Sequence, residues 1–221
     1  MTDALPTIAV FGGTGNLGYG LALRWARAGY PVIIGSRTAK RAEEAAAGIS
    51  DSVRGMDNRA AAAACDIGVL AVPFAAQRAT VEEIRDALDG KILVDVTVPL
   101  VPPRVLRVQL PEAGSAVAAI QALLGKEVRV VSAFQNVAAA HLRDPDRAIE
   151  CDVLVCGDDK AARETVIGLA EAAGLRAWHA GPIANSAAAE AMTSILMFLN
   201  RTYGIDGSGF RITGAPTKDG A

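Results

Sequence analysis

The sequence has few cysteines, few aromatic residues and no long apolar run. Its three cysteines, Cys65, Cys151 and Cys156, lack the spacing of a disulfide framework or a metal site, so we expect them to be small buried apolar residues. No apolar stretch approaches the roughly 20 residues that span a bilayer. The first residues lack the basic segment and apolar stretch of a signal peptide. These absences predict a cytoplasmic protein with no membrane partner.

The sequence also lacks an excess of charge of either sign. Lysine and arginine total 22 and aspartate and glutamate 24, giving a formal net charge of -2. No run of basic residues stands out, so neither nucleic acid nor an anionic membrane is an expected partner.

What the sequence does have is an alternation of short apolar runs with alanine-rich helical stretches, which is typical of a parallel sheet covered on both faces. Strands are predicted at 7–11, 31–35, 53–56, 67–72, 92–96, 128–133, 152–155 and 176–178. Helices are predicted at 17–28, 40–49, 58–64, 75–87, 117–124, 160–173 and 184–201. The expected fold is an α/β, Rossmann-type doubly wound sheet with a small helical carboxy-terminal part.

Two units are expected within this fold. Residues 1–183 should form a dinucleotide-binding domain, and residues 184–221 a helical segment for substrate binding or dimerisation. The last helix is apolar along much of its length, which predicts a homodimer assembled through it. After Tyr203 the chain is rich in glycine, proline and charge, so we expect it to end in disorder.

A glycine-rich turn follows the first predicted strand. Gly13, Gly15 and Gly18 match the dinucleotide fingerprint, and Gly12, Gly15 and Gly18 match a looser spacing with the same physical roles. One glycine allows a tight turn, one lets the backbone approach a pyrophosphate, and one lets helix and strand pack closely. Because the turn joins a strand to a helix in an alternating chain, it predicts a dinucleotide site.

The end of the second strand indicates which dinucleotide binds. A site selective for NAD carries an acid there to bind the ribose 2′-hydroxyl, whereas this chain has Ser36 and Arg37, with Lys40 and Arg41 one turn later. Arginine presents planar donors suited to a phosphate, and a carboxylate would repel it. The sequence therefore predicts NADP(H).

Candidates for proton transfer are scarce. Asp95 lies in an apolar strand and is expected to be a structural hydrogen-bond acceptor. No tyrosine is paired with a lysine four residues on, and the predicted helix 184–201 has no lysine, offering Asn185, Ser186 and Glu190 instead. Reduction of a carbonyl needs a proton donor, whereas hydride exchange between two ring cofactors needs mainly alignment. The pattern thus favours a ring acceptor.

With these residues in view, the sequence resembles the NADP oxidoreductases that reduce or oxidise the deazaflavin coenzyme F420. The resemblance rests on an ordered series of segments, 12–18, 35–37, 65–73, 131–133, 155–159 and 180–186. It implies a homodimer in which a nicotinamide ring stacks on the small-molecule ring cofactor. The NADP(H) contacts it implies are Gly13, Thr14, Gly15, Asn16, Leu17, Ser36, Arg37, Arg41, Val72, Pro73, Val98 and Ala139.

One position departs from the family pattern. Members of the family carry a histidine two residues after the Val-Ser-Ala segment, where this chain has Gln135. Gln135 is therefore the candidate contact for the acceptor. Two alternatives stay open from the residues: a pterin of the tetrahydrofolate or tetrahydromethanopterin type as acceptor, and a non-catalytic NADP(H) sensor.

Overall fold

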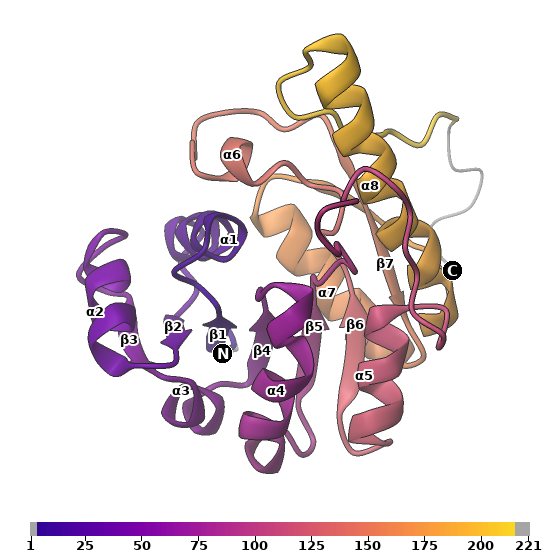
Figure 1. The fold of residues 1–221 in the computed structure, drawn as a ribbon. Coiled ribbons are helices and arrows are strands. Elements are labelled where there is room, and N and C mark those ends of the chain that lie inside the picture. Colours follow the sequence, from indigo (N-terminus) through magenta and orange to yellow (C-terminus); the bar gives the residue numbers. More distant parts are fainter. Residues whose placement is uncertain (1–3, 215–221) are drawn as a thin grey trace.

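The structure, a computed structural model, describes residues 4–214 and has eight strands in the order β3-β2-β1-β4-β5-β6-β7-β8 (Figure 1). The strands are β1 Ile8–Phe11, β2 Val32–Ser36, β3 Arg54–Asp57, β4 Ile67–Leu70, β5 Ile92–Asp95, β6 Arg129–Ser132, β7 Asp152–Gly157 and β8 Arg176–His179. All neighbouring pairs are parallel except β6 and β7. The predicted doubly wound, mainly parallel fold is confirmed.

Helices cover both faces of this sheet, because successive strand residues point to opposite sides. Ile8 and Val10 of β1 belong to one core cluster, and Ala9 and Phe11 to the other. The helices are α1 Asn16–Arg27, α2 Ala39–Ala47, α3 Asn58–Ala64, α4 Phe74–Ile84, α5 Ala116–Leu124, α6 Ala139–Leu142, α7 Lys160–Ala172 and α8 Ser186–Tyr203. Short 3₁₀ turns lie at Arg85–Ala87 and Ile183–Asn185.

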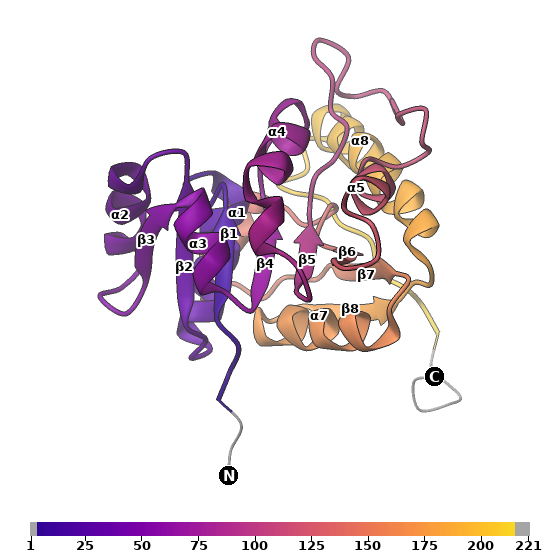
Figure 2. The ribbon, with the colours of Figure 1, turned by 90° about the horizontal axis from the view of Figure 1, so that it is seen from below.

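The first core cluster takes side chains from α1, α2 and α7, and the second from α3, α4 and α5. Figure 1 shows α1 on one side of the strands and α3, α4 and α5 on the other. Seen from below, the strands lie side by side, and the loop after β5 projects from the edge at which β1, β2, β4 and β5 end (Figure 2). Both layers expected from the sequence are present.

Every helix predicted from the sequence is found, with ends shifted by at most three residues. One helix was missed: α6 has four residues, too few to show an apolar period. Gly29 and Gly174, just after α1 and α7, have φ of 91° and 79°, in the left-handed region that favours glycine at helix ends. The three cysteines are free and buried. None of the helices in residues 4–214 is long and apolar enough to cross a membrane.

The segment after α8, up to residue 214, is held against β7 and α8 by hydrogen bonds. Residues 215–221, where the predicted disorder would end the chain, lie outside the described residues. Before them the chain runs along the start of β7, where the Phe210 carbonyl accepts a hydrogen bond from the Asp152 amide at 2.9 Å. Ser208 donates its amide hydrogen to Asn200 of α8 at 2.7 Å. Helix α8 packs against both α5 and β7. The division of the chain into two units at residue 183 stays a prediction.

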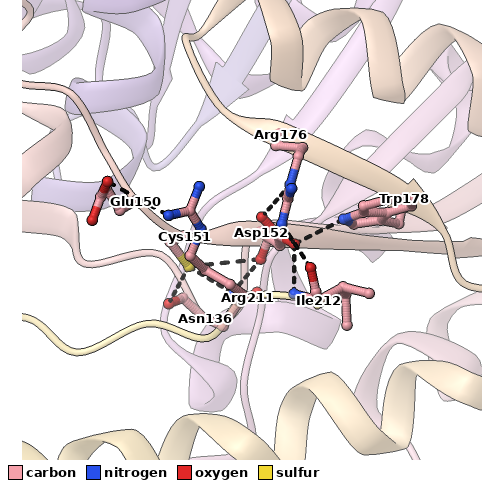
Figure 3. A network of polar contacts seen from close by, with 8 residues as sticks. All are labelled: Asn136, Glu150, Cys151, Asp152, Arg176, Trp178, Arg211 and Ile212. Atoms are coloured by element: carbon pink, nitrogen blue, oxygen red, sulfur yellow. Dashed lines mark hydrogen bonds and ion pairs between the residues drawn. The ribbon is translucent and has the colours of Figure 1, made fainter. Parts of the chain in front are cut away.

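Asp152, at the start of β7, is the centre of a buried polar network that holds this tail (Figure 3). Its carboxylate accepts hydrogen bonds from Arg176 Nε at 2.7 Å, Trp178 Nε1 at 2.8 Å and the Ile212 amide at 2.7 Å. Burial acts to raise the pKa of Asp152, but the bonds from Arg176, Ile212 and Trp178 outweigh it and lower the pKa from 3.8 to about 2. The charged form is therefore stabilised by the fold.

We expect Asp152→Asn to lower the free energy of unfolding by about 2 kcal/mol at neutral pH, because charged hydrogen bonds are lost. A carboxyl group with a lowered pKa stabilises the fold above its unfolded pKa, and this contribution is lost as the pH falls through the folded value. The difference between the two proteins should thus disappear as the pH falls from near 4 toward 2 (the range between the two pKa values above). Urea titration at several pH values measures it.

Glu150→Gln is the matched control. Glu150 pairs with Arg211 at 3.5 Å, and both side chains are mostly exposed, so the pair contributes little. A loss of stability in the control equal to that of Asp152→Asn would contradict the role given to the buried network.

Candidate functional site

The carboxyl ends of β1, β2, β4 and β5 meet at one edge of the sheet, where ligands bind in folds of this class. The glycine turn leaves β1 at this edge and enters α1. Gly12 has φ of 84°, and a Cβ there would lie 2.4 Å from the Ala71 carbonyl oxygen. A Cβ on Gly18 would lie 2.8 Å from the Gly12 carbonyl oxygen. Side chains are excluded from both positions.

These contacts decide between the two glycine spacings. Gly12 makes the tight turn and Gly18 the close helix contact, so the looser spacing of Gly12, Gly15 and Gly18 describes the geometry. Gly13 is buried beneath the turn, where a Cβ would lie 2.8 Å from Ile34 Cδ1. Gly13 therefore packs against the sheet beneath the turn. Gly15 is exposed and lies on the side of the turn that faces solvent.

The start of α1 is suited to an anion. Its N-cap, Gly15, has no side chain to accept from the first amides, and the first turn holds no acidic residue. Unsatisfied amide groups and the helix dipole there favour a phosphate. Asn16 and Leu17 form the beginning of this turn, so two further predicted contacts lie at the same place.

A cleft of about 280 Å³ opens beside the turn, between β2 and α4. It brings together many of the residues predicted to bind the dinucleotide, and its lining holds no acidic side chain: Gly12, Thr14, Gly15, Ser36, Arg37, Arg41, Asn58, Ala71, Val72, Pro73, Ala76 and Thr80. Ser36 is buried at the end of β2, whereas Arg37 and Arg41 are exposed. The arrangement fits the adenosine half of a dinucleotide with a 2′-phosphate.

Four residues of this cleft were not predicted as contacts from the sequence: Asn58, Ala71, Ala76 and Thr80. Asn58 is buried, donates to Glu83 Oε2 at 3.2 Å, and has no partner for its Oδ1 atom. The position of Asn58 directly after the third strand was the sequence signal that could have indicated it as a site residue. Ala76 and Thr80 lie on one face of α4 and resemble any helical surface positions, so no local signal marks them.

Beyond the cleft, the predicted residues Val98, Gln135 and Ala139 follow β5 and β6, at the neighbouring part of the same edge. Val98 is half-buried after β5, and Ala139 is half-buried at the start of α6. Gln135 is buried, and its Nε2 donates to the Asp95 carbonyl and to Ser132 Oγ, both at 2.9 Å. Its Oε1 has no partner.

Asp95 is fully buried beneath this part of the edge. It accepts hydrogen bonds from Gln77 Nε2 at 2.6 Å and the Thr97 amide at 2.9 Å, as expected of a structural acceptor. Burial raises the pKa of Asp95, against the opposing effect of these hydrogen bonds. Within residues 4–214 there is no group of three or more His, Cys, Asp and Glu side chains able to hold a metal ion.

Two polar residues near the start of α8, Ser186 and Glu190, are used for packing. Glu190 is buried and accepts from Ser115 Oγ at 2.6 Å and from the Ala116 amide at 2.8 Å, at the start of α5. Ser115 also bonds Ser186 Oγ at 2.5 Å. Burial raises the pKa of Glu190, which the hydrogen bonds oppose. Ser186 and Glu190 are therefore an anchor for α8 on α5.

Comparisons of the sequence with known proteins agree on one family. The sequence profile described as "NADP oxidoreductase coenzyme F420-dependent" matches residues 7–99. The F420-dependent NADP reductase of Methanocaldococcus jannaschii is 41% identical over 219 residues, covering 93% of this chain and 97% of that protein. The enzyme of the same name from Methanothermobacter thermautotrophicus is 41% identical over 224 residues, covering 96% of this chain and 97% of that protein.

A solved structure resembles the whole fold. A candidate F420-dependent NADP reductase from Arthrobacter sp. FB24 superposes with a TM-score of 0.84 and 26% identity, covering 95% of this chain and 100% of the other. The helical carboxy-terminal part is included in this match.

We expect Arg37→Ala to weaken NADPH binding by about 1.5–3 kcal/mol, the usual scale of a lost charged hydrogen bond, and to leave NADH binding almost unchanged. Fluorescence titration with each nucleotide measures the two affinities. Lys40→Ala is the matched control, because Lys40 is an exposed cation in the first turn of the following helix, α2, and does not line the cleft. Equal losses for NADPH and NADH would contradict the assignment of Arg37 to the 2′-phosphate.

Proposed function

The chain belongs to the family of F420-dependent NADP reductases, and we propose that it transfers a hydride between NADP(H) and coenzyme F420. The observation that carries this proposal is 41% identity to a reductase of that name over nearly the full length of both chains. The acid-free cleft with Arg37 and Arg41 supports NADP(H) as the dinucleotide. A cytoplasmic location stays a prediction from the sequence.

The residues that would hold NADP(H) form two groups. Ser36, Arg37 and Arg41 would hold the 2′-phosphate and ribose at the end of β2, and Thr14, Asn16 and Leu17 the pyrophosphate at the start of α1. Val72, Pro73, Val98 and Ala139 would border the nicotinamide at the ends of β4 and β5 and at α6. When bound, NADP(H) supplies or receives the hydride, and the chain's own residues align the two rings and exclude water.

Gln135 is proposed to contact the nicotinamide amide or the deazaflavin from the end of β6. Its unpartnered Oε1 supports this role, because a buried amide oxygen gains from a donor brought by a ligand. Both its amide hydrogens are already held, by the Asp95 carbonyl and Ser132. The backbone carbonyl of Gln135 accepts a hydrogen bond from Thr193 Oγ1 of α8 at 2.9 Å, which also holds the residue in place. A neutral side chain suffices, since direct hydride transfer needs no acid here.

The proposed reaction is tested with NADPH deuterated at C4. We expect deuterium on the ring carbon of reduced F420, because hydride passes directly between stacked rings, as mass spectrometry would detect. If a tetrahydrofolate or tetrahydromethanopterin precursor is turned over and F420 is not, the protein is a pterin reductase and the proposed F420 activity is wrong. NADPH binding without turnover of any ring acceptor would leave a sensor. Gln135→His should retain F420 turnover, and loss of that turnover with NADPH binding intact would contradict the expectation that a histidine can serve in place of Gln135.

We further propose a homodimer assembled through α8. Leu196 of this helix is buried against its own subunit, while Ile195 and Phe198 on another face are 46% and 51% exposed. Val101, Val108 and Leu110 of the loop between β5 and α5 are exposed as well. The backbone of this loop is held to α8, since Ser194 Oγ donates to the Arg107 carbonyl at 3.4 Å. A second copy would cover these apolar side chains.

Phe198→Glu should convert the dimer to a monomer, because a charge in the interface would be buried without a partner. Light scattering at micromolar concentration gives the mass of each species. Leu5→Glu adds the same charge at an exposed apolar side chain on the amino-terminal segment and should leave the mass unchanged. A wild-type protein with the mass of one chain would overturn the proposal.

A further inference from the structure

Arg143, at the end of α6, is an exposed arginine that lies beside the start of α1 although 127 residues separate it from Asn16. Its Nη1 donates to Asn16 Oδ1 at 2.9 Å, and its guanidinium lies 4.7 Å from the centre of the Tyr19 ring. Asn16 is the first residue of α1, and Tyr19 lies one turn later. The cation thus stands next to the uncapped amides of the helix.

The backbone on both sides of Arg143 is held by buried contacts with α1. A Cβ on Gly20 would lie 2.6 Å from Leu142 Cβ, so α1 and α6 touch at a glycine. Arg24, which is 7% exposed, donates to the carbonyls of Leu142 at 3.1 Å and Asp144 at 2.7 Å, the two residues that flank Arg143. The same guanidinium also reaches three other carbonyls, those of His141, Arg147 and Ala173.

This clamp places an exposed side chain at a defined position. Loops normally move more than the elements they join, but carbonyls bound to a buried guanidinium are costly to release, because the charge would lose its partners. The backbone therefore holds Arg143 beside Asn16, in addition to the contacts that its own guanidinium makes with Asn16 and Tyr19.

The positive charge of Arg143 has no carboxylate partner within the described part of the chain. Arg143 is in none of the ion pairs formed among residues 4–214, whereas nearby Arg27 pairs with Asp146 at 2.7 Å and Arg147 with Asp206 at 3.3 Å. Asp144, its neighbour in sequence, accepts instead from the Asp146 amide. A cation left without a carboxylate, fixed beside open helix amides, is arranged for an anion brought by a ligand.

We propose that Arg143 binds the pyrophosphate of the dinucleotide at the start of α1. The inference rests on the proposed binding of NADP(H). It gives the site two arginines with different tasks: Arg37 meets the phosphate that distinguishes NADPH from NADH, and Arg143 meets the pyrophosphate that both contain. It also ties α6, which carries Ala139 beside the proposed nicotinamide position, to occupancy of the phosphate site.

The test is titration of Arg143→Ala with three nucleotides. NADPH and NADH should both bind about tenfold more weakly or worse, the scale of a lost charge-assisted hydrogen bond. Adenosine 2′-monophosphate, which has the 2′-phosphate and no pyrophosphate, should bind as it does to the wild type. Arg37→Ala should show the reverse selectivity, losing NADPH and adenosine 2′-monophosphate but keeping NADH.

Arg27→Ala is the matched control, since it removes the same charge at the other end of α1, and its nucleotide affinities should be unchanged. Arg143→Lys keeps the charge and should recover part of the affinity, and its thermal unfolding should match the wild type. Unchanged NADPH and NADH binding in Arg143→Ala would overturn the inference, as would an equal loss for adenosine 2′-monophosphate. These titrations contain no deazaflavin, so failure of F420 turnover would contradict the proposed function and leave the role of Arg143 standing.

Discussion

The close approach of α1 to its own glycine turn is the contact on which the candidate site depends. Any side chain at Gly18 would meet the Gly12 carbonyl, and any at Gly12 would meet the Ala71 carbonyl after β4. Moving α1 outward to relieve either clash would carry its open amides away from the ends of β1 and β4. It would also separate Gly20 from Leu142, and with it α1 from α6. One backbone contact thus sets the positions of the phosphate site, the cleft and the segment beyond β6.

The part of the sheet edge that follows β5 and β6 is held by buried polar groups instead of glycines. Glu190 spans from α8 to the amides of α5, and Thr193 spans from α8 to the carbonyl of Gln135. Burying a carboxylate is costly, and here the cost is offset because three donors from one helix start face it. The same logic holds for Asp95 and Asp152. The carboxy-terminal part therefore joins the sheet by specific bonds, which orient α8 as well as attach it.

Arginine serves opposite purposes in two parts of this protein. Arg24 is buried and bonds only to carbonyls in the described structure, so its charge is spread over five dipoles. Arg37 and Arg41 are exposed in a cleft without acids, so their charge is available to a ligand. A planar guanidinium with five donors can do either, which is why residue type alone does not separate a structural arginine from a binding one.

The amino-acid sequence by itself determined the alternating α/β architecture, the glycine turn and the basic end of β2, because each depends on residues adjacent in the chain. Apolar runs of a few residues and glycines at a strand end express local backbone needs, and such needs can be read in order. Arg24 and Arg143 could not be found that way, since their contacts lie 117 to 149 residues away. Nor could the sequence choose between the two glycine spacings, because the choice depends on which backbone carbonyls lie close to each glycine. The tertiary structure decided these points, because it brings together backbone carbonyls and helix ends that carry no mark in the residues that form them.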